Sequence, residues 1–150
     1  MNKIKPYLYF LPSVAMLVLI YKFSAQTGSA SGSLSGHVAE ALVRIVHPDS
    51  TGAVLQARIQ ALQLPVRKAA HFSEYALLCL TWLFGFMKSG LAKGHSFQLA
   101  LALSLTAACA DEFHQSMVPG RSPQVLDVCI DFAGACVAAG LTRLAVRKTR

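Results

Sequence analysis

Apolar residues gather in four long stretches along the chain, and each stretch has the length of a membrane-spanning helix. The stretches cover residues 6–23, 66–87, 95–113 and 123–144. Each is close to the ~20 apolar residues that cross the ~30 Å hydrocarbon core of a bilayer. A helix is expected because backbone groups in lipid must bond within their own segment. The pattern therefore predicts an all-α integral membrane protein, a bundle of four transmembrane helices in a single domain over residues 1–150.

The connection between the first two stretches, residues 24–64, has a different pattern. Residues 24–36 are rich in serine and glycine, which predicts a flexible or turn-rich segment. Residues 37–46 and 54–62 then carry apolar side chains at helical spacing, and Pro65 suits the start of the second span. We therefore expect short amphipathic helices in this first external loop, either lying on the membrane interface over the bundle or packed against its end.

Composition supports the membrane class and argues against nucleic acid as a partner. The chain is 54% hydrophobic and only 14% charged, whereas a soluble domain carries about 25% charged residues. A net charge of +7 could suit nucleic acid. The basic residues cluster at the ends of the apolar stretches, however, where a membrane protein carries lysine and arginine in any case.

The distribution of charge predicts an orientation with both termini in the cytoplasm. In that arrangement eight of the fourteen basic residues lie on the inner side: Lys3, Lys5, Lys88, Lys93, Arg143, Arg147, Lys148 and Arg150. The acidic residues all fall on the other side, so the polar chemistry faces outward. A secretion signal over residues 1–30 is the alternative for the first stretch, but Pro12 and the polar exit at residues 22–24 favour a retained helix.

Ionisable residues inside or beside the last three apolar stretches are the clearest functional signal. A charge at the bilayer centre costs roughly 2.5–3.5 kcal/mol on insertion scales, so such residues are rare and are functional candidates. With alternating topology they all fall at one membrane face: His71, Glu74, Asp111, Glu112, His114, Asp127 and Asp131. The sequence predicts a polar site at one end of the bundle.

In the second stretch, Lys68, His71 and Tyr75 are spaced i, i+3 and i+7, which places them on one helical face. Glu74 lies three residues beyond His71. Because an imidazole titrates near neutral pH, His71 could act as a general acid or base with Glu74 to orient it. The alternative is a histidine that serves only packing.

In the third stretch, Asp111, His114 and Gln115 share a face by the same spacing, unless these groups merely form a solvated helix end. A Pro-Gly turn then places Arg121 beside the start of the last helix. An arginine and a helix N-terminus together suit phosphate or carboxylate. The alternative for Arg121 is an ion pair with Asp127.

In the last stretch, Asp127, Asp131 and Gly134 are spaced i, i+4 and i+7, so Asp131 lies deeper in the membrane. It could pair structurally with Lys68, His71 or Arg121, or it could be catalytic or bind an ion. Gly134, with Gly140 and several alanines, allows helices to approach closely, as small residues do in membrane proteins.

Three blocks of residues carry a family resemblance. They are Arg-Lys-x-Ala-His-Phe-x-Glu-Tyr at 67–75, Asp-Glu-x-x-Gln-x-x-x-Pro-Gly-Arg at 111–121 and Asp-x-x-x-Asp-x-x-Gly at 127–134. In order and spacing they resemble the VanZ-like family of small bacterial membrane proteins, which is named from a teicoplanin-resistance context. Residues 22–28 also look like the first-loop pattern of that family. One departure is Asp131, where the family often has asparagine.

The resemblance implies a multi-pass protein of the bacterial cytoplasmic membrane, with membrane lipid as its partner. One function it implies is an enzyme acting on lipid headgroups or lipid-linked envelope precursors. Lys68, Tyr75 and Arg121 would bind the substrate. The catalytic candidates are His71, Glu74, Asp111, Glu112, His114, Gln115, Asp127 and Asp131. Their oxygen and imidazole ligands would suit a divalent cation such as Mg²⁺, Mn²⁺ or Zn²⁺, although no ligand spacing selects one.

A second functional class fits the same residues. It is a non-catalytic module that binds lipid or a glycopeptide antibiotic and contributes to resistance. A small transporter is less well supported, because the chain shows no inverted repeat.

Overall fold

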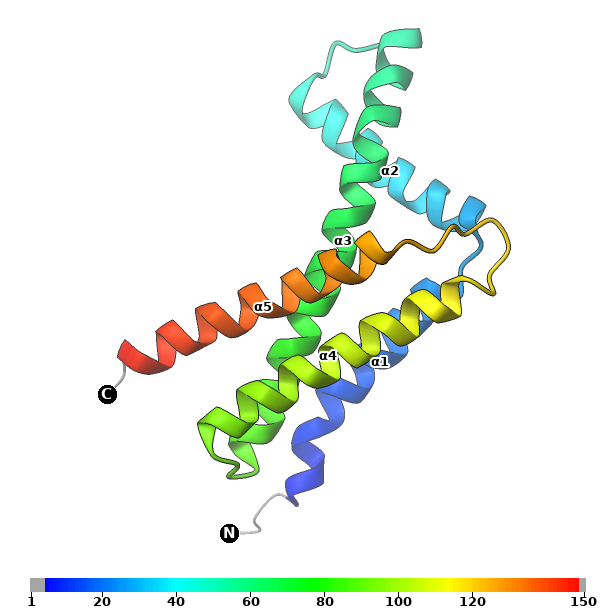
Figure 1. Cartoon of the computed structure of the whole chain (residues 1–150). Helices are drawn as coiled ribbons and strands as arrows, with labels where there is room; N and C mark the ends of the chain where they lie inside the picture. The colour runs from blue at the N-terminus through cyan, green and yellow to red at the C-terminus, as the bar shows by residue number, and fades with distance from the viewer. Residues whose placement is uncertain (1–4, 149–150) are drawn as a thin grey trace.

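The computed structural model describes residues 5–148, and every regular element in that range is a helix (Figure 1). In chain order they are η1 (Pro6–Phe10), α1 (Leu11–Ser24), α2 (Gly28–Val46), α3 (Gly52–Lys88), α4 (Lys93–Gln115) and α5 (Val125–Lys148). η1 is a short 3₁₀ turn that leads directly into α1. The predicted all-helical class is confirmed.

The longest helix, α3, is the axis on which the others pack (Figure 1). Its 37 residues correspond to about 55 Å at 1.5 Å per residue, well beyond the thickness of a hydrocarbon core. α2 crosses its N-terminal half, where Gly32 approaches Gln63 and Arg67. η1 packs near its C-terminal end, where Phe10 meets Gly85. In the middle of the molecule, α3, α4 and α5 share a core of mostly small residues, and α4 and α5 contribute its alanines.

The predicted turn-rich segment at residues 24–36 is limited to a short turn at residues 25–27. The prediction is wrong for residues 28–36, because α2 begins at Gly28 and runs without a break to Val46. The Oγ1 atom of Thr27 caps the helix by accepting a hydrogen bond from the amide of Ala30. α2 packs against α3, and Gln63 Nε2 of α3 donates to the carbonyl of Gly32 at 2.5 Å. Contacts between helices thus outweigh the poor helix propensity of serine and glycine.

Pro65 does not start a helix, as the sequence had predicted, but lies inside α3. The expected short helix at residues 54–62 and the expected span at 66–87 are therefore one continuous helix. A proline in a helix interior removes one backbone hydrogen bond, and here the contacts of α2 with Gln63 and Arg67, on either side of it, hold the helix together. The other three predicted stretches are helices whose ends differ only slightly from those expected.

Two helices of the described residues are long and apolar enough to cross a membrane, Pro6–Ser24 and Val125–Arg147. Only 17% of the first and 33% of the second is buried within the molecule, whereas the core helix of a soluble protein would be mostly covered. Leu11 and Leu141, for example, are 59% and 63% exposed. These faces are suited to contact with lipid. α3 and α4 carry more polar residues. Their crossing of the membrane is a prediction from the sequence.

A glycine sets the close crossing of α3 and α5. A Cβ atom at Gly134 would overlap the backbone carbonyl of Phe72, the residue next to His71. One turn before Gly134, Asp131 is therefore brought up to His71. The predicted role of Gly134 in close helix packing is confirmed, while Gly140 faces open space.

Gly134→Ala is expected to lower the thermal unfolding midpoint of the detergent-solubilised protein, because the new methyl group has no room against Phe72. Gly140→Ala is the matched control on the same helix. It should preserve or raise the midpoint, since alanine is favoured over glycine in a helix interior by about 1 kcal/mol. Equal effects of the two substitutions would contradict the close crossing.

Candidate functional site

Polar side chains from α3, α4 and α5 meet in one buried cluster. Ligand atoms of His71, Asp111 and Asp131 all lie within 4.8 Å of one another, and each residue comes from a different helix. The Nδ1 atom of His71 is 3.4 Å from Oδ1 of Asp131. Asp131 is completely buried and Asp111 is 8% exposed. The predicted convergence of these three residues is therefore present in the structure.

Matching helical spacings on α3 and α5 create a second contact beside the first. Lys68 lies one turn before His71, and Asp127 lies one turn before Asp131. Lys68 donates a hydrogen bond to Asp127. Because this lysine already has an acidic partner within the chain, it is not a free cation for substrate. Asp127 therefore forms its ion pair with Lys68 and not with Arg121, the partner considered from the sequence.

Tyr75 lies one turn deeper on the same face of α3 and is completely buried. Its hydroxyl group has no hydrogen-bond partner. The residue is next to the cluster but does not line the cavity described below, so it is not placed to contact a ligand there.

A chain of hydrogen bonds links the end of α4 to α1. Gln115 Nε2 donates to Oδ2 of Asp111 at 2.8 Å, and Arg121 Nη1 donates to Oε1 of Gln115 at 3.5 Å. The remaining donors of Arg121 reach backbone carbonyls, Nε to Gln26 at 3.1 Å and Nη2 to Phe23 at 3.0 Å. Arg121 thus holds the connection between α4 and α5 against the end of α1.

The start of α5 is occupied by a carboxylate from the chain itself. The amide of Gln124, immediately before α5, donates to Oε1 of Glu112 at 2.5 Å. Glu112 is buried and therefore satisfies the position that the sequence had assigned to a bound anion. The expectation that Arg121 and an open helix N-terminus act together is not met.

His114 points away from the cluster. Its Nδ1 atom is 3.1 Å from Oγ of Ser24, and its ring stacks on Tyr21 with centroids 4.8 Å apart. The expected common face of Asp111, His114 and Gln115 is thus correct for Asp111 and Gln115 only. α4 ends at Gln115. His114, three residues after Asp111, faces α1, whereas Gln115, four residues after Asp111, stays on the side of Asp111.

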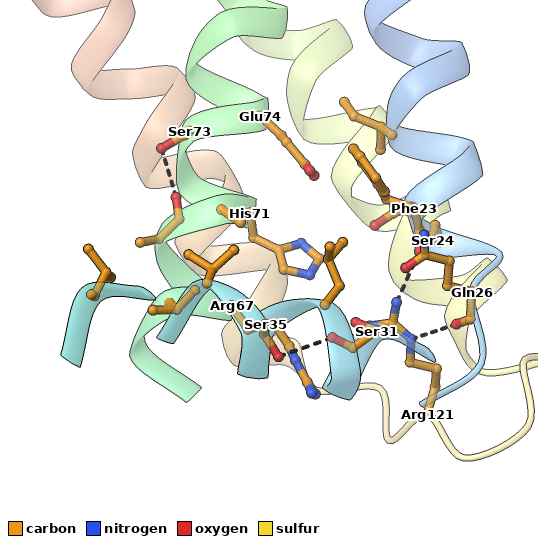
Figure 2. Close-up of a pocket in the computed structure, with 18 residues that line it drawn as sticks. Phe23, Ser24, Gln26, Ser31, Ser35, Arg67, His71, Ser73, Glu74 and Arg121 are labelled. Atoms are coloured by element: carbon orange, nitrogen blue, oxygen red, sulfur yellow. Dashed lines mark hydrogen bonds between the residues drawn. The ribbon is translucent and has the colours of Figure 1, made fainter. Parts of the chain in front are cut away.

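A cavity of about 510 Å³ opens beside the cluster, and Figure 2 shows His71, Glu74 and Arg121 around it. α2 covers one side and the ends of α1 and α4 bound the other. Its apolar wall comes from α1, α2 and α3: Ile20, Phe23, Leu34, Val38, Leu42 and Val66. Its ionisable groups are Arg67, His71, Glu74, Asp111 and Arg121. The cavity is therefore apolar on one side and strongly polar on the other.

Two arginines line this cavity, and the sequence analysis had singled out only Arg121. Arg67 lines the wall, and its buried Nε atom has no hydrogen-bond partner. Burial lowers the pKa of Arg121, and the nearby charge of Arg67 lowers it further. Neighbouring cations of this kind favour the binding of an anion between them. The sequence could have pointed to Arg67, since this residue is the first of the block 67–75 that contains His71.

Val38 and Leu42 line the cavity from the amphipathic helix expected at residues 37–46, but the contribution of the first part of α2 was missed. Ser31, Ser35 and Leu34 line it from a segment that had been expected to be largely irregular. The first part of α2 is rich in serine and glycine, so its sequence does not show which residues face α3. The face is identified only from the packing of α2 on α3.

Comparison with known proteins identifies the family. The family model described as VanZ/LLP1 matches residues 9–146, a range that takes in α1 to α4 completely and nearly all of α5. No curated protein and no solved structure matches the chain. The match includes all three blocks from which the resemblance was inferred, and that inference is confirmed. With its exposed apolar helices, this membrane protein belongs to the VanZ/LLP1 family.

Proposed function

We propose that the chain is a four-span protein that binds a lipid or lipid-linked envelope precursor with a phosphate-bearing headgroup, and that its polar cluster acts on that headgroup. The observation that carries the proposal is the cavity beside α2, which joins an apolar wall to two arginines and an acid–base set. That combination matches a molecule with a hydrophobic chain and an anionic head.

The size and lining of the cavity suit such a ligand. A volume of about 510 Å³ falls within the roughly 300–1,000 Å³ of small-molecule sites. The wall formed by Leu34, Val38 and Leu42 would receive the first part of a lipid chain. Arg67, whose Nε lacks a partner, would donate to the headgroup, because a guanidinium presents several donors in a planar fork suited to phosphate.

The acid–base groups lie at the polar end of the same cavity. His71, Glu74 and Asp111 all line it, and Figure 2 shows the imidazole of His71 directed into it between Glu74 and the arginines. A histidine beside carboxylates can take a proton from an attacking hydroxyl group or water and return it to a leaving group. We therefore propose hydrolysis or transfer at a phosphodiester or acyl bond of the headgroup.

A non-catalytic binding module is the second candidate, and a specific observation favours it. Lys68 is paired with Asp127, and Arg121 donates to backbone carbonyls and Gln115. Much of the polar set is therefore already satisfied within the chain and could serve to hold the cavity in shape. In that case the protein would bind lipid, or a glycopeptide antibiotic, without chemical change.

The proposed orientation follows from the positions of the helix ends. The start of η1, the α3–α4 connection and the end of α5 lie at the end of the molecule away from the cavity (Figure 1). Six of the basic residues assigned to the cytoplasmic side belong to these three regions or flank them: Lys5, Lys88, Lys93, Arg143, Arg147 and Lys148. Lys3 and Arg150 lie outside the described residues. We propose a bacterial cytoplasmic membrane protein in which α1, α3, α4 and α5 cross the bilayer and the cavity opens at the outer face.

The topology can be tested by cysteine labelling in intact cells. Ser33→Cys on α2 should react with a membrane-impermeant thiol reagent, and Ser89→Cys, after α3, should react only after permeabilisation. Both positions are exposed, so local burial does not decide the result. The experiment uses a background without the four native cysteines. Labelling of Ser89→Cys from outside, with Ser33→Cys protected, would overturn the orientation.

Lipid binding can be tested by the mass of lipid that purifies with the protein. Arg67→Gln should reduce retention of an anionic lipid at least about tenfold, since a hydrogen bond to a charged group contributes about 1.5–3 kcal/mol. Arg143→Gln, which removes a charge at the far end of α5, is the matched control and should retain lipid normally. Equal retention in both variants would contradict the role of Arg67.

Catalysis is distinguished from binding by His71→Gln and Asp111→Asn. If the site is catalytic, both should reduce turnover of the lipid headgroup, followed by mass spectrometry of membrane lipids, by ~10²–10⁴-fold. His114→Gln is the control, because His114 does not line the cavity and its ring stacks on Tyr21. Expression is measured for every variant. If His71→Gln is fully active, acid–base catalysis at this residue is excluded and the binding module is favoured.

A further inference from the structure

The cluster that contributes His71 and Asp111 to the cavity has a chemical composition that acid–base catalysis alone does not require. It brings one imidazole and two carboxylates within 4.8 Å, from three different helices. Asp131 is completely buried, and neither of its carboxylate oxygens has a hydrogen-bond partner. Nδ1 of His71 also lacks one, although it lies 3.4 Å from Asp131 Oδ1. Buried polar atoms of a native protein normally have partners.

The lysine and arginine residues nearby do not bond directly to the carboxylates of Asp111 and Asp131. Arg121 reaches Asp111 only through Gln115, and Lys68 is engaged with Asp127. A divalent cation would balance both carboxylates at once and would use the lone pairs that are now unpartnered.

We infer that His71, Asp111 and Asp131 bind one divalent transition-metal cation, and Zn²⁺ is the ion with which the site is tested. Zinc takes imidazole nitrogen and carboxylate oxygen as ligands, and a catalytic zinc site has three protein ligands with a fourth position open. With bonds of about 2.0–2.1 Å, the corners of a tetrahedron lie about 3.4 Å apart. One of the three separations, 3.4 Å between Nδ1 of His71 and Oδ1 of Asp131, agrees with this spacing, and all three ligand atoms lie within 4.8 Å of one another.

The surroundings of the three residues support a metal site. Asp111 is oriented by the hydrogen bond from Gln115 to its Oδ2, which leaves Oδ1 for a cation. Oriented ligands of this kind are a common feature of metal sites. His71 and Asp111 line the cavity while Asp131 lies behind them. The cavity therefore gives a cation a route of access, and the open coordination position would face the same space as Arg67.

The inference is independent of lipid binding, because its readout is the metal itself. The full-length protein in lipid nanodiscs is stripped with a chelator, loaded with Zn²⁺, desalted and analysed for metal content by mass spectrometry. One zinc per chain is expected. Co²⁺ loaded in the same way should give visible ligand-field absorption of a low-symmetry site, and His71→Gln should alter that spectrum by removing the nitrogen ligand.

Asp111→Asn and Asp131→Asn should each weaken Zn²⁺ binding by more than about 100-fold, beyond the 10–100-fold typical of losing an outer hydrogen-bond partner. Asp127→Asn is the matched control on α5, one turn from Asp131 but paired with Lys68. It should retain one zinc. Wild-type protein without bound metal, or equal loss in Asp127→Asn and Asp131→Asn, would overturn the inference.

A second measurement covers the case in which a variant does not fold. Zinc that binds the native site should raise the thermal midpoint of the wild-type protein, and a chelator should reverse the rise. The control variant Asp127→Asn should show the same response. A midpoint that zinc leaves unchanged in the wild-type protein would also overturn the site.

Discussion

The complete burial of Asp131 in an apolar helix is the constraint on which the arrangement depends. A carboxylate removed from water is strongly unfavourable unless an opposite charge or several hydrogen-bond donors compensate it. α5 can therefore pack only where α3 presents His71 to it. Gly134 makes that approach possible, because any side chain at this position would meet the backbone of Phe72. One acidic residue and one glycine together fix the crossing of the two helices.

The same constraint extends to the rest of the molecule through hydrogen bonds. Asp111 brings α4 to the cluster, and Gln115 links it to Arg121. Arg121 then bonds the carbonyls at the end of α1, while the amide of Gly28 donates to Pro119 at the start of α2. The polar network thus reaches every long helix. His71, which lies 3.4 Å from Asp131, also lines the cavity together with Asp111, so helix packing and ligand binding rest on some of the same residues.

α2 gives this site its apolar half. Gln63 donates to the carbonyl of Gly32 where α2 lies against α3, and Leu34 and Val38 of α2 close the cavity on one side. A polar cluster alone would bind a small ion. A polar cluster beside a covered apolar wall can hold a molecule that has both a charged and a hydrophobic part, which is the physical reason for favouring a lipid.

Much of this structure could be predicted from the sequence, because apolar stretches of about twenty residues in a membrane can only be helices. The convergence of His71, Asp111 and Asp131 followed from their spacing and from the cost of leaving them in lipid. The positions of His114 and Glu112 could not be predicted. Helical periodicity predicts which side chains of one helix share a face. It does not predict which neighbouring helix or loop each side chain contacts at the end of that helix.

Two further differences have a similar origin. Local propensity suggested irregular structure at residues 24–36 and a helix start at Pro65, and in both places packing between α2 and α3 prevailed. Arg67 was overlooked because a basic residue beside an apolar stretch usually marks a membrane boundary. Only the structure shows that its side chain lines the cavity.

The most direct test of the central claim, that Asp131 is held by a network shared with α3, is a double-mutant cycle on His71 and Asp131. Unfolding free energies in detergent are measured for the wild-type protein, His71→Gln, Asp131→Asn and the double variant. The account predicts strong non-additivity, with an interaction energy in the upper part of the roughly 0.5–3 kcal/mol found for residues in one network. Additive effects of the two substitutions would contradict it.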